Sequence, residues 1–86
     1  MQLARYVKFR EEKFGAVLFE TRSEKVFTLN PTAAAVVREL QAGHDEREIV
    51  AILKQRFRDT DDAVEREVVA FLADLREKGL LDETTP

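Results

Sequence analysis

The first third of the chain alternates apolar and polar residues in short runs, which is typical of β-strands. Residues 6–10 alternate strictly and place Val7 and Phe9 on one face. Residues 16–19 form a continuous apolar run, as expected of a strand that is covered on both faces. Residues 25–29 return as a third strand, and the short connections favour antiparallel neighbours. The pattern therefore predicts a three-stranded meander.

A different pattern begins at Asn30 and Pro31, a preferred helix N-cap followed by a residue favoured at the first helical position. The first predicted helix starts here and continues to Gln41. Asp45 opens a second helix, and Glu48, three residues later, completes an acidic variant of the capping box.

A third helix is predicted over residues 63–78, and Gly79 ends it. Residues 80–81 are expected to fold back on the core, and residues 82–86 to form a flexible tail. The apolar stripes predicted to face the core are Ala33, Ala34, Val36, Val37 and Leu40 in the first helix, Ile49, Ile52, Leu53 and Phe57 in the second, and Val64, Val68, Phe71 and Leu75, with Leu72 on the border, in the third. The predicted fold class is α+β and winged-helix-like, a three-stranded antiparallel meander followed by three α-helices. Residues 1–81 are predicted to form its single domain.

Composition narrows the class of protein. The chain has 86 residues, enough for one domain with one core. Its 14 Lys and Arg against 17 Asp and Glu give a formal net charge of −3, which argues against a nonspecific nucleic-acid binder. It contains no cysteine, so neither disulfides nor thiolate chemistry are expected. No apolar run approaches the ~18 residues of a membrane span, and a cytoplasmic location is expected.

The side-chain inventory is poor in catalytic groups. Ser23 and His44 are the only serine and histidine, and no nucleophile-elbow motif surrounds the serine. One histidine without cysteines cannot build a structural zinc site, and the three glycines are too scattered for a phosphate-binding loop. No catalytic residue, metal or cofactor is therefore assigned, and the chain is predicted to be a binding module and not an enzyme.

The third predicted strand carries the first candidate binding site. A three-stranded meander leaves two edges, and an unpaired edge presents backbone donors and acceptors to an extended peptide. This strand contains one lysine and no proline, so its edge is poorly protected. The candidate peptide-binding residues here are Lys25, Val26, Phe27, Thr28 and Leu29. In the alternative interpretation, Phe27 and Leu29 serve only as core side chains, and the backbone edge remains the better candidate.

One flank of the third helix is the second candidate. Val69 lies about 115° from the centre of the core stripe, next to a small residue and two guanidinium groups. Such a surface suits an apolar and acidic peptide, and its predicted residues are Arg66, Val69, Leu72, Ala73 and Arg76. Two alternatives stay open. In one, the arginines pair with neighbouring acids on a solvated face. In the other, the peptide contacts the opposite flank, which is formed by Glu67, Ala70 and Asp74.

The order of these features resembles the PqqD family of small peptide-binding proteins, also called RiPP recognition elements. The resemblance extends from about Val7 to Leu81 and depends on the order and spacing of several ordinary stretches. They are Phe14-Gly15-Ala16-Val17-Leu18, Val26-Phe27-Thr28-Leu29-Asn30 with Thr32-Ala33-Ala34, Gly43, Glu48-Ile49 with Leu53 and Phe57, Val68 with Phe71-Leu72 and Leu75, and Gly79-Leu80-Leu81. The opening of the second strand is more similar to other branches, including the mycofactocin branch, than to the pyrroloquinoline-quinone member.

The resemblance implies a domain that captures the leader segment of a ribosomally made precursor peptide. In that family the leader adds as an extra strand beside the third strand, within the groove formed with the third helix. The domain presents the peptide to a modifying enzyme, often a radical S-adenosylmethionine (radical SAM) enzyme. Any iron–sulfur cluster would belong to that partner, because this chain has no cysteine to hold one.

Two other functions stay open. A winged-helix DNA-binding protein would use the second or third helix for recognition, but the third helix carries four acids against three bases, a poor match for phosphates. An adaptor would bind only the partner enzyme and no free peptide. An exposed edge of the third strand also permits a homodimer through strand pairing.

Overall fold

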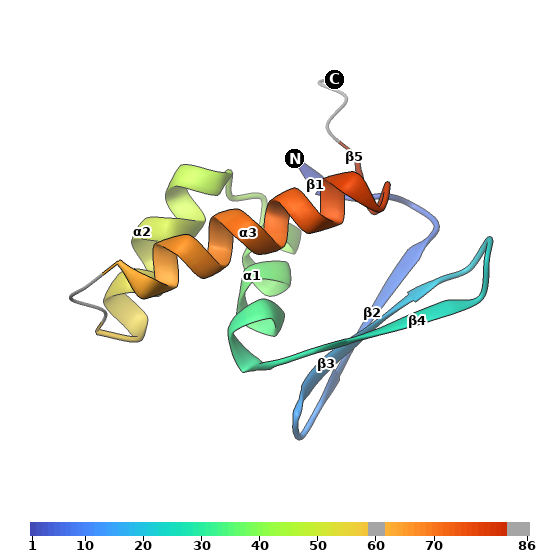
Figure 1. The fold of residues 1–86 in the computed structure, drawn as a ribbon, viewed down its shortest axis with the longest axis horizontal. Helices are drawn as coiled ribbons and strands as arrows, with labels where there is room; N and C mark the ends of the chain where they lie inside the picture. The colour runs from blue at the N-terminus through green and yellow to red at the C-terminus, as the bar shows by residue number, and fades with distance from the viewer. Residues whose placement is uncertain (59–61, 83–86) are drawn as a thin grey trace.

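The computed structural model describes residues 1–58 and 62–82. Three antiparallel strands precede three helices, and two very short strands join the ends of the described chain (Figure 1). The elements in chain order are β1 (Gln2–Leu3), β2 (Val7–Glu12), β3 (Gly15–Glu20), β4 (Lys25–Leu29), α1 (Pro31–Gln41), α2 (Glu46–Arg56), α3 (Ala63–Glu77) and β5 (Leu81–Asp82). The predicted α+β class, with a meander followed by three helices, is confirmed.

β2, β3 and β4 form one antiparallel sheet in that order. Leu18 of β3 pairs with Phe9 of β2 and Phe27 of β4, so these three side chains share the inner face of the sheet. Ala16 and Leu18 are fully buried, whereas Phe19 is 36% exposed. The prediction that this strand is covered on both faces is therefore wrong, because α1 packs against the inner face only.

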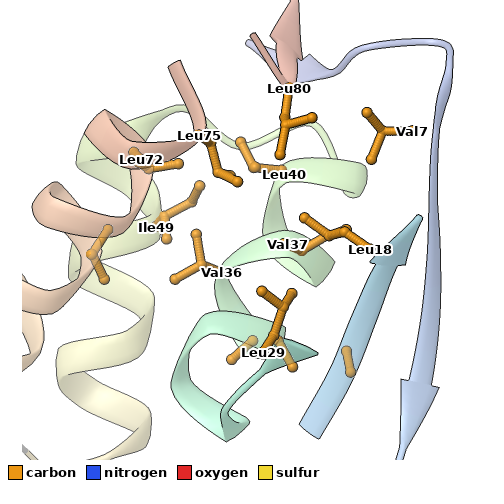
Figure 2. Close-up of a cluster of buried hydrophobic side chains, with 14 of the residues drawn as sticks. Val7, Leu18, Leu29, Val36, Val37, Leu40, Ile49, Leu72, Leu75 and Leu80 are labelled. Carbon is orange, nitrogen blue, oxygen red and sulfur yellow. The ribbon is translucent and has the colours of Figure 1, made fainter. Parts of the chain in front are cut away.

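α1 is buried on two sides. Residues 34–37 are all buried, as expected for a helix enclosed between two layers. Val37 points toward Leu18 of the sheet, while Val36 points toward α2 and α3 (Figure 2). The predicted stripe omitted Ala35 because the pattern of one helix does not show that a second layer lies behind it.

The predicted N-caps of the first two helices are confirmed. The Asn30 side chain accepts a hydrogen bond from the Ala33 N–H at 2.8 Å. Asp45 and Glu48 form the capping box, with reciprocal hydrogen bonds of 2.9 and 3.0 Å. Phe57 was predicted for the buried face of α2, but it follows the last helical residue and is 43% exposed. That part of the prediction is wrong because the helix ends before the stripe reaches this position.

α3 is rotated about its axis relative to the prediction. Its buried residues are Val68, Leu72 and Leu75, while Phe71 and Val64 are only partly buried. Leu72, which was predicted for the border, is therefore at the centre of the stripe. The physical reason is that α3 packs against both α1 and α2, so the core position is the one that faces both helices.

β1 and β5 were not predicted and join the two ends of the described chain (Figure 1). Leu3 pairs with Leu81, and the expected fold-back of Leu80 is confirmed by its burial. Asp82, the first residue of the predicted tail, pairs with Gln2 in this short sheet. The rest of the predicted tail, residues 83–86, lies outside the described residues. Within the described ranges, none of the helices has the length and apolar character needed to cross a bilayer.

The turn between β3 and β4 is organised by Glu20. Its carboxylate accepts hydrogen bonds from the backbone N–H groups of Arg22 and Ser23, at 2.8 and 3.2 Å, and from the Ser23 hydroxyl. The hydroxyl bond is the largest of the effects that hold the pKa of Glu20 below its ordinary value. Glu24 adopts a left-handed conformation, with φ at 62°, just before β4 begins. The carboxylate therefore helps to set where β4 starts.

At the other end of β3, Gly15 lies where no side chain fits. Its φ is +147°, and a Cβ atom at this position would lie 2.1 Å from the carbonyl oxygen of Leu29 and 2.8 Å from the carbonyl carbon of Asn30. This close approach brings the start of β3 against the junction of β4 and α1.

We expect Gly15→Ala to lower the free energy of unfolding by about 2 kcal/mol or more, because the methyl group must displace the Leu29 backbone at an unfavourable φ. Gly43→Ala is the matched control. The φ of Gly43 is +95°, but nothing lies within 4 Å of an added Cβ, so only about 1 kcal/mol of backbone strain is expected there. Urea unfolding monitored by circular dichroism measures both losses, and equal losses would contradict the steric explanation.

A second prediction concerns pH. Because the pKa of Glu20 is lowered in the folded state, its carboxylate stabilises the fold above its ordinary value of 4.5, and this contribution is lost as the pH falls toward the folded value. We expect Glu20→Gln to be less stable than the wild type at neutral pH, with the difference shrinking through the acid range. Urea unfolding of both proteins across that range is the measurement. A difference that does not change with pH would exclude this role for the carboxylate.

Candidate functional site

β4 is an edge strand of the described sheet. β3 pairs with one of its edges, and no described strand pairs with the other. The free edge is bounded by the Glu20 turn at one end and by the helix cap Asn30 at the other. Lys25 is the only charged residue of β4, and the strand contains no proline. Its sequence therefore does little to block the addition of another strand.

The register of the sheet shows which backbone groups of β4 face this edge. Glu12 and Gly15 flank a two-residue loop, so they form a hydrogen-bonded pair. Bonded and non-bonded pairs alternate along antiparallel strands, so the even-numbered residues of β3 direct their backbone groups to β4. Phe27 pairs with Leu18, one of these even-numbered residues, so the N–H and C=O groups of Phe27 point toward β3. The N–H and C=O groups of Val26 and Thr28 then point to the free edge, where an extended peptide can bind them.

A groove of about 490 Å³ lies beside this edge, between β4 and α3. Its lining residues are Leu18, Val26, Phe27, Thr28, Leu29, Asn30, Ala33, Phe71, Asp74, Leu75, Lys78 and Leu80. A second hollow of about 230 Å³ continues along α3 to Glu67 and Ala70. Residues 26–29 of the predicted strand site thus line the groove, and Lys25 lies at its hairpin end beside Lys78.

The groove is apolar at its floor and polar at its α3 rim. Phe71 and Ala33 are partly exposed there and offer apolar contact surface. On the rim, the Lys78 ammonium pairs with Asp74 one turn earlier in the chain. These two charges offset each other, so this part of the rim presents a neutral pair to an apolar side chain that enters the groove.

The C-terminal end of α3 is held in place by two contacts. The Tyr6 hydroxyl donates a hydrogen bond to the carbonyl oxygen of Gly79. The Leu80 N–H donates to the Leu75 carbonyl at 2.9 Å, and the Leu80 side chain is buried. Gly79 permits this reversal because its φ is +72°. The α3 wall of the groove is therefore anchored to the residues that precede β2.

The predicted flank of α3 does not line the groove. Leu72 is fully buried, and Val69 lies about 160° around the helix from Phe71. Arg76 Nη2 lies 3.3 Å from Glu46 Oε1, so this flank faces α2. None of the five residues predicted on this flank, Arg66, Val69, Leu72, Ala73 and Arg76, lines the groove. The cause is the rotation of α3 that puts Leu72 at the centre of the core stripe.

The opposite flank, which was the alternative in the sequence analysis, lies in the groove. The residues that α3 contributes are Glu67, Ala70, Phe71, Asp74, Leu75 and Lys78. The sequence analysis assigned Phe71 to the core. The one signal for this flank was that Phe71 and Leu72 are adjacent in the sequence. Adjacent residues of a helix point in different directions, so only one of the two can face both α1 and α2. Asn30 and Ala33 carried no such signal. The sequence predicts where α1 begins along the chain, but its periodicity does not show that this end of the helix lies beside α3 in space.

Two solved structures share this fold over nearly their whole length. A structure of TbiB1 in complex with the TbiA(beta) leader peptide is similar over 100% of both chains, with a TM-score of 0.85 and 23% sequence identity. A lasso peptide synthetase B1 complexed with the leader peptide is similar over 92% of this chain and 93% of that chain, with a TM-score of 0.79 and 28% identity. None of the curated protein sequences matches this chain.

The family described as coenzyme PQQ synthesis protein D (PqqD) matches residues 15–81. This range includes β3, β4 and all three helices, and therefore both walls of the groove. It also confirms the resemblance stated from the sequence. The chain belongs to the PqqD family.

Proposed function

We propose that this chain captures the leader segment of a ribosomally synthesised precursor peptide and delivers it to a modifying enzyme. The leader binds as an additional strand beside β4, in the groove between β4 and α3. The observation that carries this proposal is the free edge of β4 next to a groove that has an apolar floor and α3 as its other wall. Main-chain hydrogen bonds supply affinity, and the groove selects side chains. Both similar structures are complexes with leader peptides, which supports a leader as the occupant.

The dimensions of the groove fit a short extended segment. Glu67 and Lys78 mark the two ends of its α3 wall, about 17 Å apart at a rise of ~1.5 Å per residue. An extended peptide rises ~3.3 Å per residue, so about five residues span this distance. β4 itself has 5 residues. The groove therefore matches one short strand.

The side chains of such a strand alternate between two faces. Those that point inward meet Phe71 and Ala33, so the groove favours aliphatic or aromatic residues there. Those that point outward lie beside Val26, which is 59% exposed. At the hairpin end the peptide meets Lys25, which favours an acidic residue.

In this role the chain binds and presents the peptide, and the covalent chemistry belongs to the partner enzyme. The family resemblance favours a radical SAM enzyme as that partner. The chain's own serine and histidine serve local structure: the Ser23 hydroxyl donates to Glu20, and His44 lies 3.5 Å from Glu39 and 3.7 Å from Glu48. Neither forms a nucleophile–base pair with the other.

A peptide is favoured over DNA as the occupant. On the groove flank of α3, the Glu67 carboxylate repels phosphates, and the ammonium of Lys78 is already paired with Asp74. An adaptor that binds only an enzyme differs from a leader-binding domain in one measurable respect, since only the latter binds the isolated leader.

We expect a synthetic leader of the cognate precursor to bind with a Kd on the order of 1 μM or below, about −8 kcal/mol. Amide chemical shifts in a titration followed by NMR should move most in residues 25–29 and at Phe71, Asp74 and Lys78, because strand pairing changes the backbone environment of β4 and contact changes that of α3. Shifts concentrated on α2, or no binding at all, would contradict the proposal.

Two neighbouring residues of α3 provide a matched pair of variants. Ala70 lines the groove, whereas Val69 lies on the other flank and is 43% exposed. We expect Ala70→Glu to weaken leader binding by at least about tenfold, or ~1.4 kcal/mol, because it places a carboxylate against an apolar peptide side chain. Val69→Glu should bind the leader like the wild type.

Isothermal titration calorimetry measures both affinities, and circular dichroism checks that both variants are folded. Surface changes of this kind usually alter the free energy of unfolding by within about 0.5 kcal/mol. The reverse result, a loss of affinity only with Val69→Glu, would place the peptide on the flank that faces α2.

A further inference from the structure

The outer face of the three-stranded sheet carries a second apolar surface. Pairing across the strands arranges its side chains in two rows, Lys8–Phe19–Val26 and Arg10–Val17–Thr28. Five of them, all except Thr28, surround a hollow of about 320 Å³. Phe19 is 36% exposed and Val26 is 59% exposed. We call these six residues the outer face.

The apolar content of β3 argues that something covers this face. Residues 16–19 have the pattern of a strand buried on both sides, yet the described chain buries only the inner side. Adjacent exposed apolar side chains with a polar rim are typical of an interaction surface.

The outer face and the groove are nearly separate surfaces. Of the six outer-face residues, only Val26 and Thr28, both on β4, also line the groove. A peptide strand in the groove therefore leaves Phe19 and Lys8 accessible. A third molecule can bind the outer face while the leader is in place.

The charges on the outer face favour an acidic partner. Lys8 and Arg10 lie along one rim, although the net charge of the whole chain is −3. Arg10 Nε lies 2.7 Å from Glu12 Oε1 with 77% of the arginine side chain exposed, so its other guanidinium donors remain accessible. A second copy would bring no acidic rim of its own, because Glu12 already engages Arg10. A protein with carboxylates around an apolar centre is the complementary partner.

The outer face alone is too small for a stable complex. Its three strands span two spacings of about 4.8 Å, which makes the face roughly 10 Å wide. A specific interface buries about 800 Å² on each partner, and six residues on a face this narrow do not provide that area. A leader strand beside β4 would widen the sheet by one more spacing. Its outward side chains would lie next to Val26 and continue both rows.

We propose that the outer face docks the modifying enzyme, through an apolar enzyme patch with an acidic rim, and that the bound leader completes this docking surface. This inference rests on the proposed function of the groove. The enzyme then binds the loaded domain more tightly than the empty one, because only the loaded domain presents the wider sheet. By linkage, the enzyme strengthens leader binding by the same factor.

The test uses the full chain, the precursor peptide and the purified modifying enzyme encoded with them. Biolayer interferometry measures the Kd between chain and enzyme, with and without saturating precursor. We expect the precursor to tighten wild-type binding at least about fivefold, a typical coupling between two sites. Phe19→Glu should weaken enzyme binding at least tenfold while leaving leader affinity within twofold of the wild type, as should Lys8→Glu, most strongly at low salt.

Val69→Glu is the matched control, because Val69 is exposed to a similar extent, 43% against 36% for Phe19, but lies outside both surfaces. It should change neither affinity. Circular dichroism and unfolding curves establish that each variant is folded, and Lys8→Glu decides the question if Phe19→Glu does not fold.

Four results would overturn the inference. In the first, Phe19→Glu and Lys8→Glu both bind the enzyme as tightly as the wild type does. In the second, Phe19→Glu loses affinity for the leader. In the third, the wild type is a dimer and Phe19→Glu is a monomer, and in the fourth, the wild type binds a labelled oligothymidylate and Phe19→Glu does not. The first removes the enzyme from this face, and the others assign the face to the leader, to a second copy or to a nucleic acid. If the wild type does not bind the leader, the proposed function fails separately, and the comparison of variants against enzyme alone still decides the docking surface.

Discussion

The position of α1 between the sheet and the other two helices is the constraint on which the rest of the structure depends. The helix follows β4 after one residue, Asn30, whose side chain caps it. Ala34 and Ala35 are small enough to allow close approach on both sides, while Val36 and Val37 face opposite layers (Figure 2). Because α1 fills this space, α3 packs on α1 and α2 and is held alongside β4, so the groove lies next to a strand edge that stays unpaired.

A free strand edge normally risks aggregation, and the surroundings of β4 limit what can pair with it. The edge lies beside the α3 wall, where Phe71 and the Asp74–Lys78 pair line the groove. An added strand must therefore be narrow and extended along most of its length. A single extended peptide meets this requirement, whereas the edge of a second folded sheet brings its own helices with it. The same arrangement favours peptide capture over a homodimer through β4.

Local chemistry was readable from the sequence, and the relative placement of elements was not. The meander, the Asn30 cap and the Asp45 capping box depend on neighbouring residues, and each was predicted correctly. The outcome for α3 was different. It has apolar residues on both flanks, Phe71 on one and Val69 on the other, so periodicity defines a broad stripe without saying which neighbours enclose it. The structure decides this through the packing of α1 and α2, and the candidate residues on the helix change flank as a result.

The low sequence identity within this fold has a physical explanation. The two similar structures share 23% and 28% of residues with this chain at TM-scores of 0.85 and 0.79. Recognition through a strand edge uses backbone N–H and C=O groups, which every sequence supplies, so it constrains few side chains. What it requires is a free edge and a wall at the correct distance, and these depend on core volume and on close contacts such as that of Gly15 with Leu29. In the proposed binding mode, selectivity for one peptide depends on a few groove residues, Phe71 and Ala33 among them, which can vary without altering the fold.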